Sequence, residues 1–180
     1  TLVLSCDETV QAYDGLGAYG GARPSVVNGP TGGIGKALKI LKPANPVTWG
    51  GAYFTVPAIP FTADRKTLTA RVYSTRAGAV IKFKVEAAGG VSAEVPSSPT
   101  GAANTWSTVT WALTGVDATK SYTTIAITPD PDLVTTGASY YFDDITLSGT
   151  TGNGVKPSTI ATLDEAGASL TGFEGCYDST

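Results

Sequence analysis

The sequence predicts an all-β protein, an antiparallel β-sandwich or jelly roll with an extra strand segment at its C-terminal end. Apolar and polar residues alternate with a period of two along many short runs. Turn-forming clusters, rich in the 22 glycines and 11 prolines, separate these runs. No segment of useful length shows the 3.6-residue period of an amphipathic helix. Many short strands at regular intervals are typical of sandwiches and jelly rolls.

The clearest pair of predicted strands flanks Ala77-Gly78. Leu68–Tyr73 and Val80–Glu86 both carry apolar residues at every second position, and Phe83 lies on the apolar side of the second run. Two alternating runs joined by a glycine turn predict a β-hairpin with one solvated face, and we expect Phe83 and Trp111 in the core. The other predicted strands are Leu2–Ser5, Lys36–Leu41, Gly51–Thr55, Val91–Val95, Ser107–Leu113, Thr123–Thr128 and Ser139–Leu147.

The chain divides into three parts. Residues 1–148 are long enough for a complete β-sandwich module. Residues 149–157 are small and polar, with nothing to bury, and we interpret them as a linker. Residues 158–180 are too few to form a core alone and resemble the N-terminal strand segment.

The C-terminal segment repeats features of the N-terminal one. Asp7-Glu8 and Gly15-Leu16 recur, at one common offset, as Asp164-Glu165 and Gly172-Phe173. A first strand without a module behind it must find backbone partners, either on the edge of its own sandwich or on a neighbouring copy. Addition to neighbours does not close and would build filaments. The tail residues for such an assembly are Ile160, Leu163, Asp164, Glu165 and Phe173.

The two cysteines, Cys6 and Cys176, lie near opposite ends of the chain. They either close the chain on itself, or pair with cysteines of another chain, or stay unpaired as small buried hydrophobes.

Composition argues against several functions. Charged residues make up 15% of the chain, the net charge is −3, and no basic stripe occurs, so we expect no nucleic-acid partner. No apolar run is long enough for membrane insertion. The chain lacks histidine, the commonest general base, and its close carboxylate pairs are explained by turns and strands, so we expect no enzyme. It also lacks methionine, which fits a chain processed after secretion or a cloned fragment; we expect an extracellular or cell-surface location.

Several runs resemble bacterial carbohydrate-binding modules of the β-jelly-roll type. Ser139–Leu147, with its closing Asp143-Asp144 pair, is similar to the last strand of that family. Trp49–Ala52, Phe61–Tyr73 and Trp106–Trp111 look like the same family. The resemblance implies a non-catalytic role, commonly glycan binding, and often one structural calcium ion.

A calcium site would need six to eight oxygen ligands. Asp143 and Asp144 are adjacent in a predicted strand, so their side chains face opposite sides, and a carboxylate facing the sandwich must be paired or bound to metal. Asp144 is the first candidate ligand, with Asp7 or Glu8 from the paired N-terminal strand as the second. A carboxylate satisfied by lysine, arginine or backbone donors is the alternative.

Glycan binding would use exposed aromatic rings that stack on sugars. The candidates are Tyr19, Trp49, Tyr53, Tyr73 and Trp106. Tyr73 lies on the polar face of its strand, and Trp49 follows a proline-rich loop that suits a rim; the alternative for any of them is a place in the core.

Two functional hypotheses remain. In the first, the chain is a non-catalytic extracellular module of carbohydrate-binding type that assembles head to tail with copies of itself into a filament or array. In the second, it is a glycan-binding module appended to a polysaccharide-active enzyme, and its partner is a polysaccharide. The unexplained tail favours the first.

Overall fold

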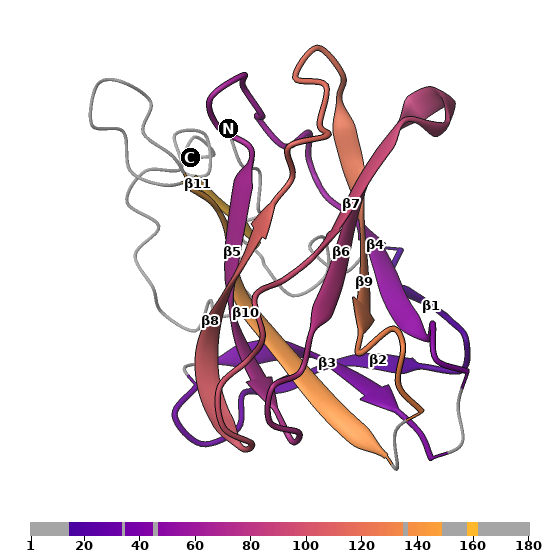
Figure 1. Cartoon of the computed structure of the whole chain (residues 1–180), viewed down its shortest axis with the longest axis vertical. Helices are drawn as coiled ribbons and strands as arrows, with labels where there is room; N and C mark the ends of the chain where they lie inside the picture. The colour runs from indigo at the N-terminus through magenta and orange to yellow at the C-terminus, as the bar shows by residue number, and fades with distance from the viewer. Residues whose placement is uncertain (1–14, 34, 45–46, 135–136, 149–157, 162–180) are drawn as a thin grey trace, which may run out of the picture.

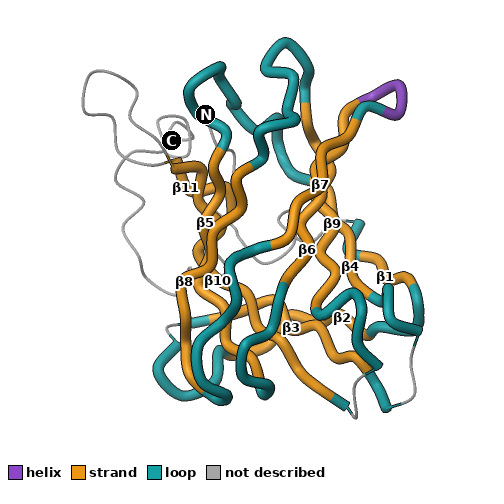
Figure 2. Tube along the Cα trace, viewed as in Figure 1, coloured by secondary structure: helices purple, strands orange, loops and turns teal. Residues whose placement is uncertain are grey.

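The computed structural model describes residues 15–33, 35–44, 47–134, 137–148 and 158–161. Two antiparallel β-sheets pack face to face as a sandwich, which confirms the predicted fold class (Figure 1). Within the described ranges the single helical element is the short 3₁₀ turn η1 (Figure 2). The elements are β1 (Gly17–Tyr19), β2 (Arg23–Asn28), β3 (Lys36–Lys42), β4 (Gly51–Thr55), β5 (Thr67–Ser74), β6 (Ile81–Ala87), η1 (Ala88–Gly90), β7 (Ser92–Pro96), β8 (Thr105–Ala112), β9 (Tyr122–Pro129), β10 (Ala138–Ser148) and β11 (Ser158–Ala161).

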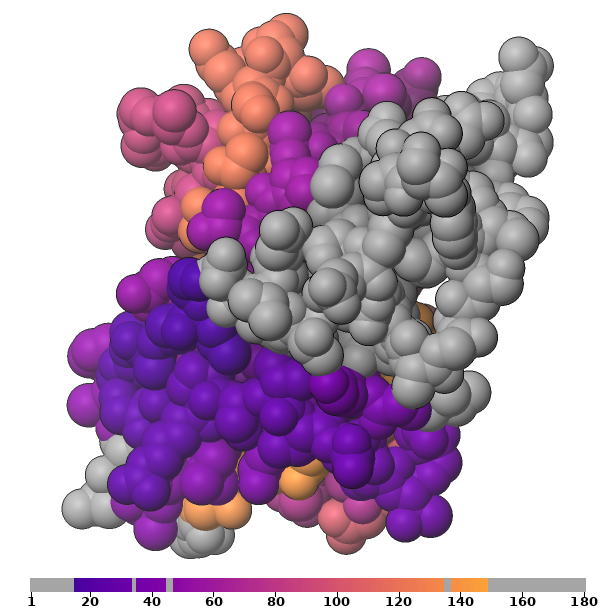
Figure 3. All heavy atoms as spheres, turned by 180° about the vertical axis from the view of Figure 1, so that it is seen from behind, coloured from indigo at the N-terminus to yellow at the C-terminus, as the bar shows by residue number. Residues whose placement is uncertain are grey.

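The five-stranded sheet has the order β1-β4-β9-β6-β7, and the six-stranded sheet has the order β2-β3-β10-β5-β8 with β11 added on β10. Every pairing between these strands is antiparallel. The η1 turn and the loop between β8 and β9 project together at one end of the molecule, in front and in back view (Figures 1 and 3).

The predicted hairpin around Ala77-Gly78 is wrong. β5 pairs with β10 and β8, whereas β6 pairs with β7 and β9, so the two strands belong to opposite sheets. Period-two alternation identifies a strand with one buried face, but it is the same for a hairpin and for a chain that crosses between layers. Ala79 is fully buried at this crossing, which is where the chain passes from one sheet to the other.

The core lies between the sheets and follows the predicted alternation. Leu68 and Val72 of β5, and Ile81 and Phe83 of β6, are fully buried. The Phe83 ring lies 4.7 Å from the Trp111 ring, centroid to centroid, and both are buried, as predicted. Each such aromatic ring removes a large apolar area from water, so this contact between the layers contributes strongly to stability.

A buried polar network closes one end of the sandwich. Asp130, in the turn after β9, is 2% exposed and has φ +42°. Its carboxylate accepts hydrogen bonds from Arg76 Nε and Nη2, both at 2.7 Å, from the Tyr140 hydroxyl at 2.6 Å and from Val80 N at 3.0 Å. The proline-flanked sequence around Asp130 predicts a turn, which the structure has, but its carboxylate is an internal anchor that turn chemistry alone does not indicate.

Strand β10 changes its neighbour half-way along. Residues 138–142 pair with β3, and after an irregularity at Asp143 and Asp144 residues 145–147 pair with β11. Asp144 has φ +50°, which breaks the strict alternation of the strand. The β11 strand therefore lies on the edge of its own sandwich.

Candidate functional site

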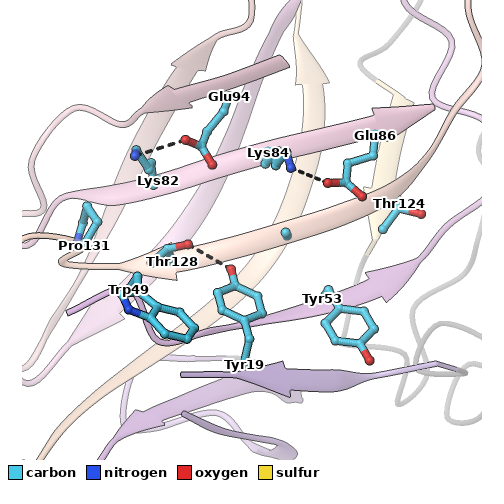
Figure 4. Close-up of a pocket in the computed structure, with 11 residues that line it drawn as sticks. Tyr19, Trp49, Tyr53, Lys82, Lys84, Glu86, Glu94, Thr124, Thr128 and Pro131 are labelled. Atoms are coloured by element: carbon cyan, nitrogen blue, oxygen red, sulfur yellow. Dashed lines mark hydrogen bonds and ion pairs between the residues drawn. The ribbon is translucent and has the colours of Figure 1, made fainter. Parts of the chain in front are cut away.

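A groove of about 420 Å³ lies on the outer face of the five-stranded sheet (Figure 4). All five strands or the loops next to them contribute to it. It is lined by Tyr19, Trp49, Tyr53, Lys82, Lys84, Glu86, Glu94, Thr124, Ala126, Thr128 and Pro131.

The register of the sheet explains how these residues meet. Gly17 pairs with Tyr53, Tyr53 with Ala126, Ala126 with Lys84, and Lys84 with Glu94, so one row crosses the whole sheet. Residues directly opposite one another on adjacent strands have neighbouring side chains. The small Ala126 side chain stands in the middle of this row, between a tyrosine and a lysine, and leaves the sheet hollow there.

Two tyrosines lie across glycines of the adjacent strand. In the pairing of β1 with β4, Gly17 is opposite Tyr53 and Tyr19 is opposite Gly51. A Cβ atom on Gly17 would lie 2.2 Å from Tyr53 Cζ. A Cβ atom on Gly51 would lie 2.2 Å from the Ile127 carbonyl oxygen and 2.5 Å from the Tyr19 hydroxyl oxygen. The Tyr53 ring therefore occupies the space that a side chain at Gly17 would fill, and the Tyr19 ring shares that at Gly51 with the backbone of β9. Both rings lie low along the sheet, and Tyr53 remains 44% exposed.

Trp49 adds a third ring to those of Tyr19 and Tyr53, and the three rings form the aromatic floor of the groove. Its ring is nearly parallel to that of Tyr19, with an angle of 10° between the planes and 6.5 Å between the centroids. Trp49 is 57% exposed although the residue is large and apolar. The loop that carries Trp49 packs closely on the turn after β1, because a Cβ on Gly20 would lie 2.7 Å from Gly50 Cα. An exposed and aligned set of rings is a surface suited to binding rather than to folding.

The opposite wall of the groove is polar. Lys82 Nζ lies 3.1 Å from Glu94 Oε1, and Lys84 Nζ lies 2.5 Å from Glu86 Oε1 (Figure 4). The hydrogen bond that Lys84 donates to the Glu86 carboxylate raises the pKa of Lys84. Two cations and two anions thus face the aromatic rings without net charge, and they offer both donors and acceptors of hydrogen bonds.

Tyr19 joins the floor to the central strand. Its hydroxyl lies 2.9 Å from Thr128 Oγ1 and donates to the Ile127 carbonyl at 3.2 Å. Burial raises the pKa of Tyr19, and the hydrogen bond with Thr128 opposes this rise. The hydroxyl therefore stays protonated at neutral pH and fixes the ring against β9.

The groove carboxylates do not form a hydrolytic pair. Glu86 and Glu94 both come from the polar wall, and each is paired with a lysine of the same wall. Glycosidases need two carboxyl groups that flank the scissile bond. Within the described residues that line the groove, no carboxylate stands opposite this wall.

Comparison with solved structures identifies the fold. A family 11 carbohydrate-binding module from Clostridium thermocellum, in complex with a β-1,3-1,4-mixed-linked tetrasaccharide, is 14% identical, with a TM-score of 0.51 over 82% of this chain and 94% of that one. The family 11 module of a cellulosomal cellulase of Clostridium thermocellum is 16% identical, with a TM-score of 0.50 over 83% and 95% of the two chains. The fold is that of a β-jelly-roll carbohydrate-binding module.

A carbohydrate-binding module of the β-sandwich superfamily is also similar, at 16% identity and a TM-score of 0.48. The match covers 72% of this chain, which spans 54% of that protein's length. No protein-family model and no curated protein sequence matches the chain.

The structure divides the predicted glycan-binding residues of the module between its two sheets. Tyr19, Trp49 and Tyr53 meet in the groove. Tyr73 and Trp106 lie on the six-stranded sheet, where Tyr73 contacts Trp106 at 5.7 Å and Tyr141 at 5.6 Å, both edge to face. The two sets therefore cannot line one site.

Trp106 is held beneath a loop. A Cβ on Gly33 would lie 2.7 Å from its ring, and Arg71 lies over the ring at 4.8 Å while it donates to the Gly32 carbonyl at 3.0 Å. The Trp106 indole nitrogen is buried and makes no hydrogen bond with the described residues. These contacts attach the loop to the sheet and leave the groove as the better aromatic surface.

The candidate calcium ligands are only partly described. Asp143 is the buried member of the pair, with 2% of its side chain exposed, and Asp144 is 45% exposed. Arg71 Nη1 lies 3.8 Å from Asp143 Oδ2 and 3.9 Å from Asp144 Oδ2, so an arginine faces both carboxylates. In the part of the chain that the structure describes, no three His, Cys, Asp or Glu residues gather around a possible ion. Asp7 and Glu8 lie outside the described residues, and the calcium site stays a prediction.

The assembly residues are also mostly outside the described part of the chain. Ile160 is in β11, whereas Leu163, Asp164, Glu165, Phe173 and both cysteines, Cys6 and Cys176, are not described. β11 pairs with β10 of the same chain, which is the self-pairing alternative for the tail. Head-to-tail assembly stays a prediction. In the described residues, no helix is long and apolar enough to cross a membrane.

Sequence reasoning missed the polar wall of the groove. Lys82, Lys84 and Glu86 are predicted to face solvent, which the structure confirms, but the sequence does not show that β6 lies in the same sheet as β4. The cross-strand row that joins them to Tyr53 depends on this sheet order. A signal was present in Gly17 and Gly51, since a glycine within a strand often marks a close approach.

Proposed function

We propose that the protein binds a polysaccharide chain in the groove of Tyr19, Trp49 and Tyr53 and does not cleave it. The observation that carries the proposal is an exposed, nearly flat aromatic floor opposite a wall of balanced hydrogen-bonding charges. Aromatic faces stack on the apolar faces of sugar rings, and the polar wall matches the hydroxyl groups at the ring edges.

The charge balance favours an uncharged glycan. An acidic sugar would have to compete with Glu86 and Glu94 for Lys84 and Lys82, and each of these lysines already has a carboxylate partner. The described relatives support the class of ligand, because one of them binds a β-1,3-1,4-mixed-linked tetrasaccharide. We infer a role outside the cell, as a module that holds a polysaccharide next to an associated activity.

The test is affinity electrophoresis with a panel of soluble polysaccharides, followed by calorimetry with a β-1,3-1,4-mixed-linked tetrasaccharide. Neutral β-glucans should retard the protein, and alginate, which is acidic, should not. A flat response across the panel would contradict the proposal.

Matched tyrosine variants locate the site. Tyr53→Ala removes a groove ring, and Tyr73→Ala removes a similar ring from the opposite sheet. Loss of one stacking ring should cost about 1–2 kcal/mol, or about 5- to 30-fold in affinity, for Tyr53→Ala. Tyr73→Ala should stay within about twofold. The reverse pattern would place the glycan on the six-stranded sheet.

A further inference from the structure

Lys42, the last residue of β3, is a fully buried lysine next to the groove. It follows Leu38 and Ile40 on the face of β3 that points between the sheets. A buried ammonium group is costly unless hydrogen bonds replace its lost water. An apolar side chain would fill this position without the cost of burying a charge, so the ammonium group itself needs an explanation.

The ammonium group is surrounded by backbone carbonyls of two loops. Lys42 Nζ donates to Thr48 O at 2.7 Å, Pro129 O at 2.9 Å and Asp130 O at 2.9 Å, and Leu133 O lies at 3.4 Å. The three N–H groups of a lysine are thereby used. Thr48 belongs to the loop between β3 and β4, whereas the other carbonyls belong to the turn after β9.

Both loops carry residues of the groove. Trp49 follows Thr48 directly, and Pro131 follows Asp130. Lys42 therefore joins the backbone next to the exposed indole to the backbone of a turn on the other side of the groove end.

The turn after β9 is itself firmly held. The Asp130 carboxylate accepts two hydrogen bonds from Arg76 and one from Tyr140, which come from the β5–β6 crossing and from β10. A chain of contacts thus runs from the far sheet through Asp130 and Lys42 to Thr48. Trp49 is more than half exposed, and its ring contacts are with Tyr19 and with the turn at Gly20, where a Cβ would lie 2.9 Å from Trp49 Cε3.

We propose that Lys42 is a positioning residue for the groove, and that its ammonium group ties the Trp49 loop to the turn after β9 and so keeps the indole ring beside Tyr19. The biological meaning of this inference rests on the proposed glycan-binding function. Its structural part, the placement of Trp49 by Lys42, is measured without any glycan.

Lys42→Met is the test variant, since methionine keeps an unbranched apolar side chain and loses the ammonium group. Lys66→Met is the matched control. Lys66 Nζ donates to the Val116 carbonyl at 2.6 Å, in the loop before β9, at the end of the sandwich opposite to the turn after β9 (Figure 1). Both variants remove a lysine ammonium group that donates to backbone carbonyls. Lys42→Met loses the carbonyls of Thr48, Pro129, Asp130 and Leu133 next to the groove, whereas Lys66→Met loses that of Val116 away from it.

The readout is fluorine NMR of protein labelled with 5-fluorotryptophan. The three tryptophans give separate signals, assigned with Trp49→Phe and Trp106→Phe. Lys42→Met should shift and broaden the Trp49 signal and leave the buried Trp111 signal in place, and Lys66→Met should leave both. An unchanged Trp49 signal in folded Lys42→Met would overturn the inference.

Glycan affinity and a wild-type measurement complete the test. Lys42→Met should bind the neutral glucan at least fivefold more weakly than Lys66→Met. If the wild-type protein binds no glycan at all, the proposed function fails while the Trp49 signal still decides the inference.

A second measurement applies if Lys42→Met does not fold. ¹⁵N-lysine labelling of the wild type should give one ammonium signal protected from water exchange, and Trp49→Ala should shift that signal. An unprotected or unshifted signal would refute the role of Lys42.

Discussion

Gly17 sets the height of the Tyr53 ring, and Gly17→Ala tests this directly. The added Cβ would lie 2.2, 2.4 and 2.6 Å from three atoms of the Tyr53 side chain, and no backbone atom is among these nearest neighbours. The ring is therefore the first group that has to move. Gly17 is not among the glycines with positive φ, so alanine fits the backbone of β1 without strain.

The expected magnitude follows from two opposing effects. Overpacking in a protein interior costs about 1–3 kcal/mol, and a ring that is 44% exposed can turn outward, so we take the lower value of about 1–1.5 kcal/mol. Replacing glycine by alanine also restricts the unfolded chain, which stabilises by about 0.4–1 kcal/mol. Gly17→Ala should therefore destabilise the wild-type protein by about 0.5 kcal/mol but stabilise the Tyr53→Ala variant by about 0.5 kcal/mol.

The assay is a double-mutant cycle by urea denaturation of the wild type, Gly17→Ala, Tyr53→Ala and the double variant. The coupling free energy should be about 1 kcal/mol, and the sign of the Gly17→Ala effect should reverse between the two backgrounds. Additive effects would show that the ring does not rest on Gly17, and the account of a flat aromatic floor would then be wrong. Gly17→Ala and Tyr53→Ala should both bind the glycan more weakly than the wild-type protein does.

Three other predictions concern stability. Burial would raise the pKa of Asp130, but hydrogen bonds from Arg76, Tyr140 and Val80 outweigh it and hold this pKa below its usual value. The free energy of unfolding should thus fall as the pH drops below about 4, and Asp130→Asn should flatten this dependence in urea titrations at several pH values. Phe83→Ala should cost about 3–5 kcal/mol, since the ring is fully buried against Trp111; a loss below 1 kcal/mol in the same assay would contradict this packing. The predicted structural calcium requires that EDTA lower the Tm and that Ca²⁺ restore it; an unchanged Tm would count against the ion.

The sequence predicts the strands well and their partners poorly. The bounds of β4 match the expected Gly51–Thr55, and the buried positions of β5 and β6 follow the alternation. β1 and β2 escape prediction because β1 is short and both contain glycine or proline, which weaken a strand signal. Sheet order depends on contacts between distant segments, and a local period carries no information about them.

The candidate site shows the same limit. Composition and position predict which aromatic residues are candidates for glycan binding. Tyr19, Trp49 and Tyr53 gather in the groove, whereas Tyr73 and Trp106 lie on the other sheet. Lys42 ends a run of alternating residues on the buried side, where a lysine breaks the pattern. Only the two loops that surround it, far apart in sequence, explain why it is there.

The β11 strand has a consequence for any association between copies. It occupies the backbone groups of residues 145–147 of β10, so a strand from another molecule can add at this place only by displacing it. Nine residues separate β10 from β11 in the sequence, and a tether this short gives an effective local concentration on the order of millimolar. At ordinary protein concentrations we therefore expect β11 to pair with β10 of its own chain rather than with that of another molecule. Exchange of β11 between molecules would need a high local concentration on a surface or a partner strand that binds more tightly. Pairing within one chain or between chains would then depend on how densely the protein is packed.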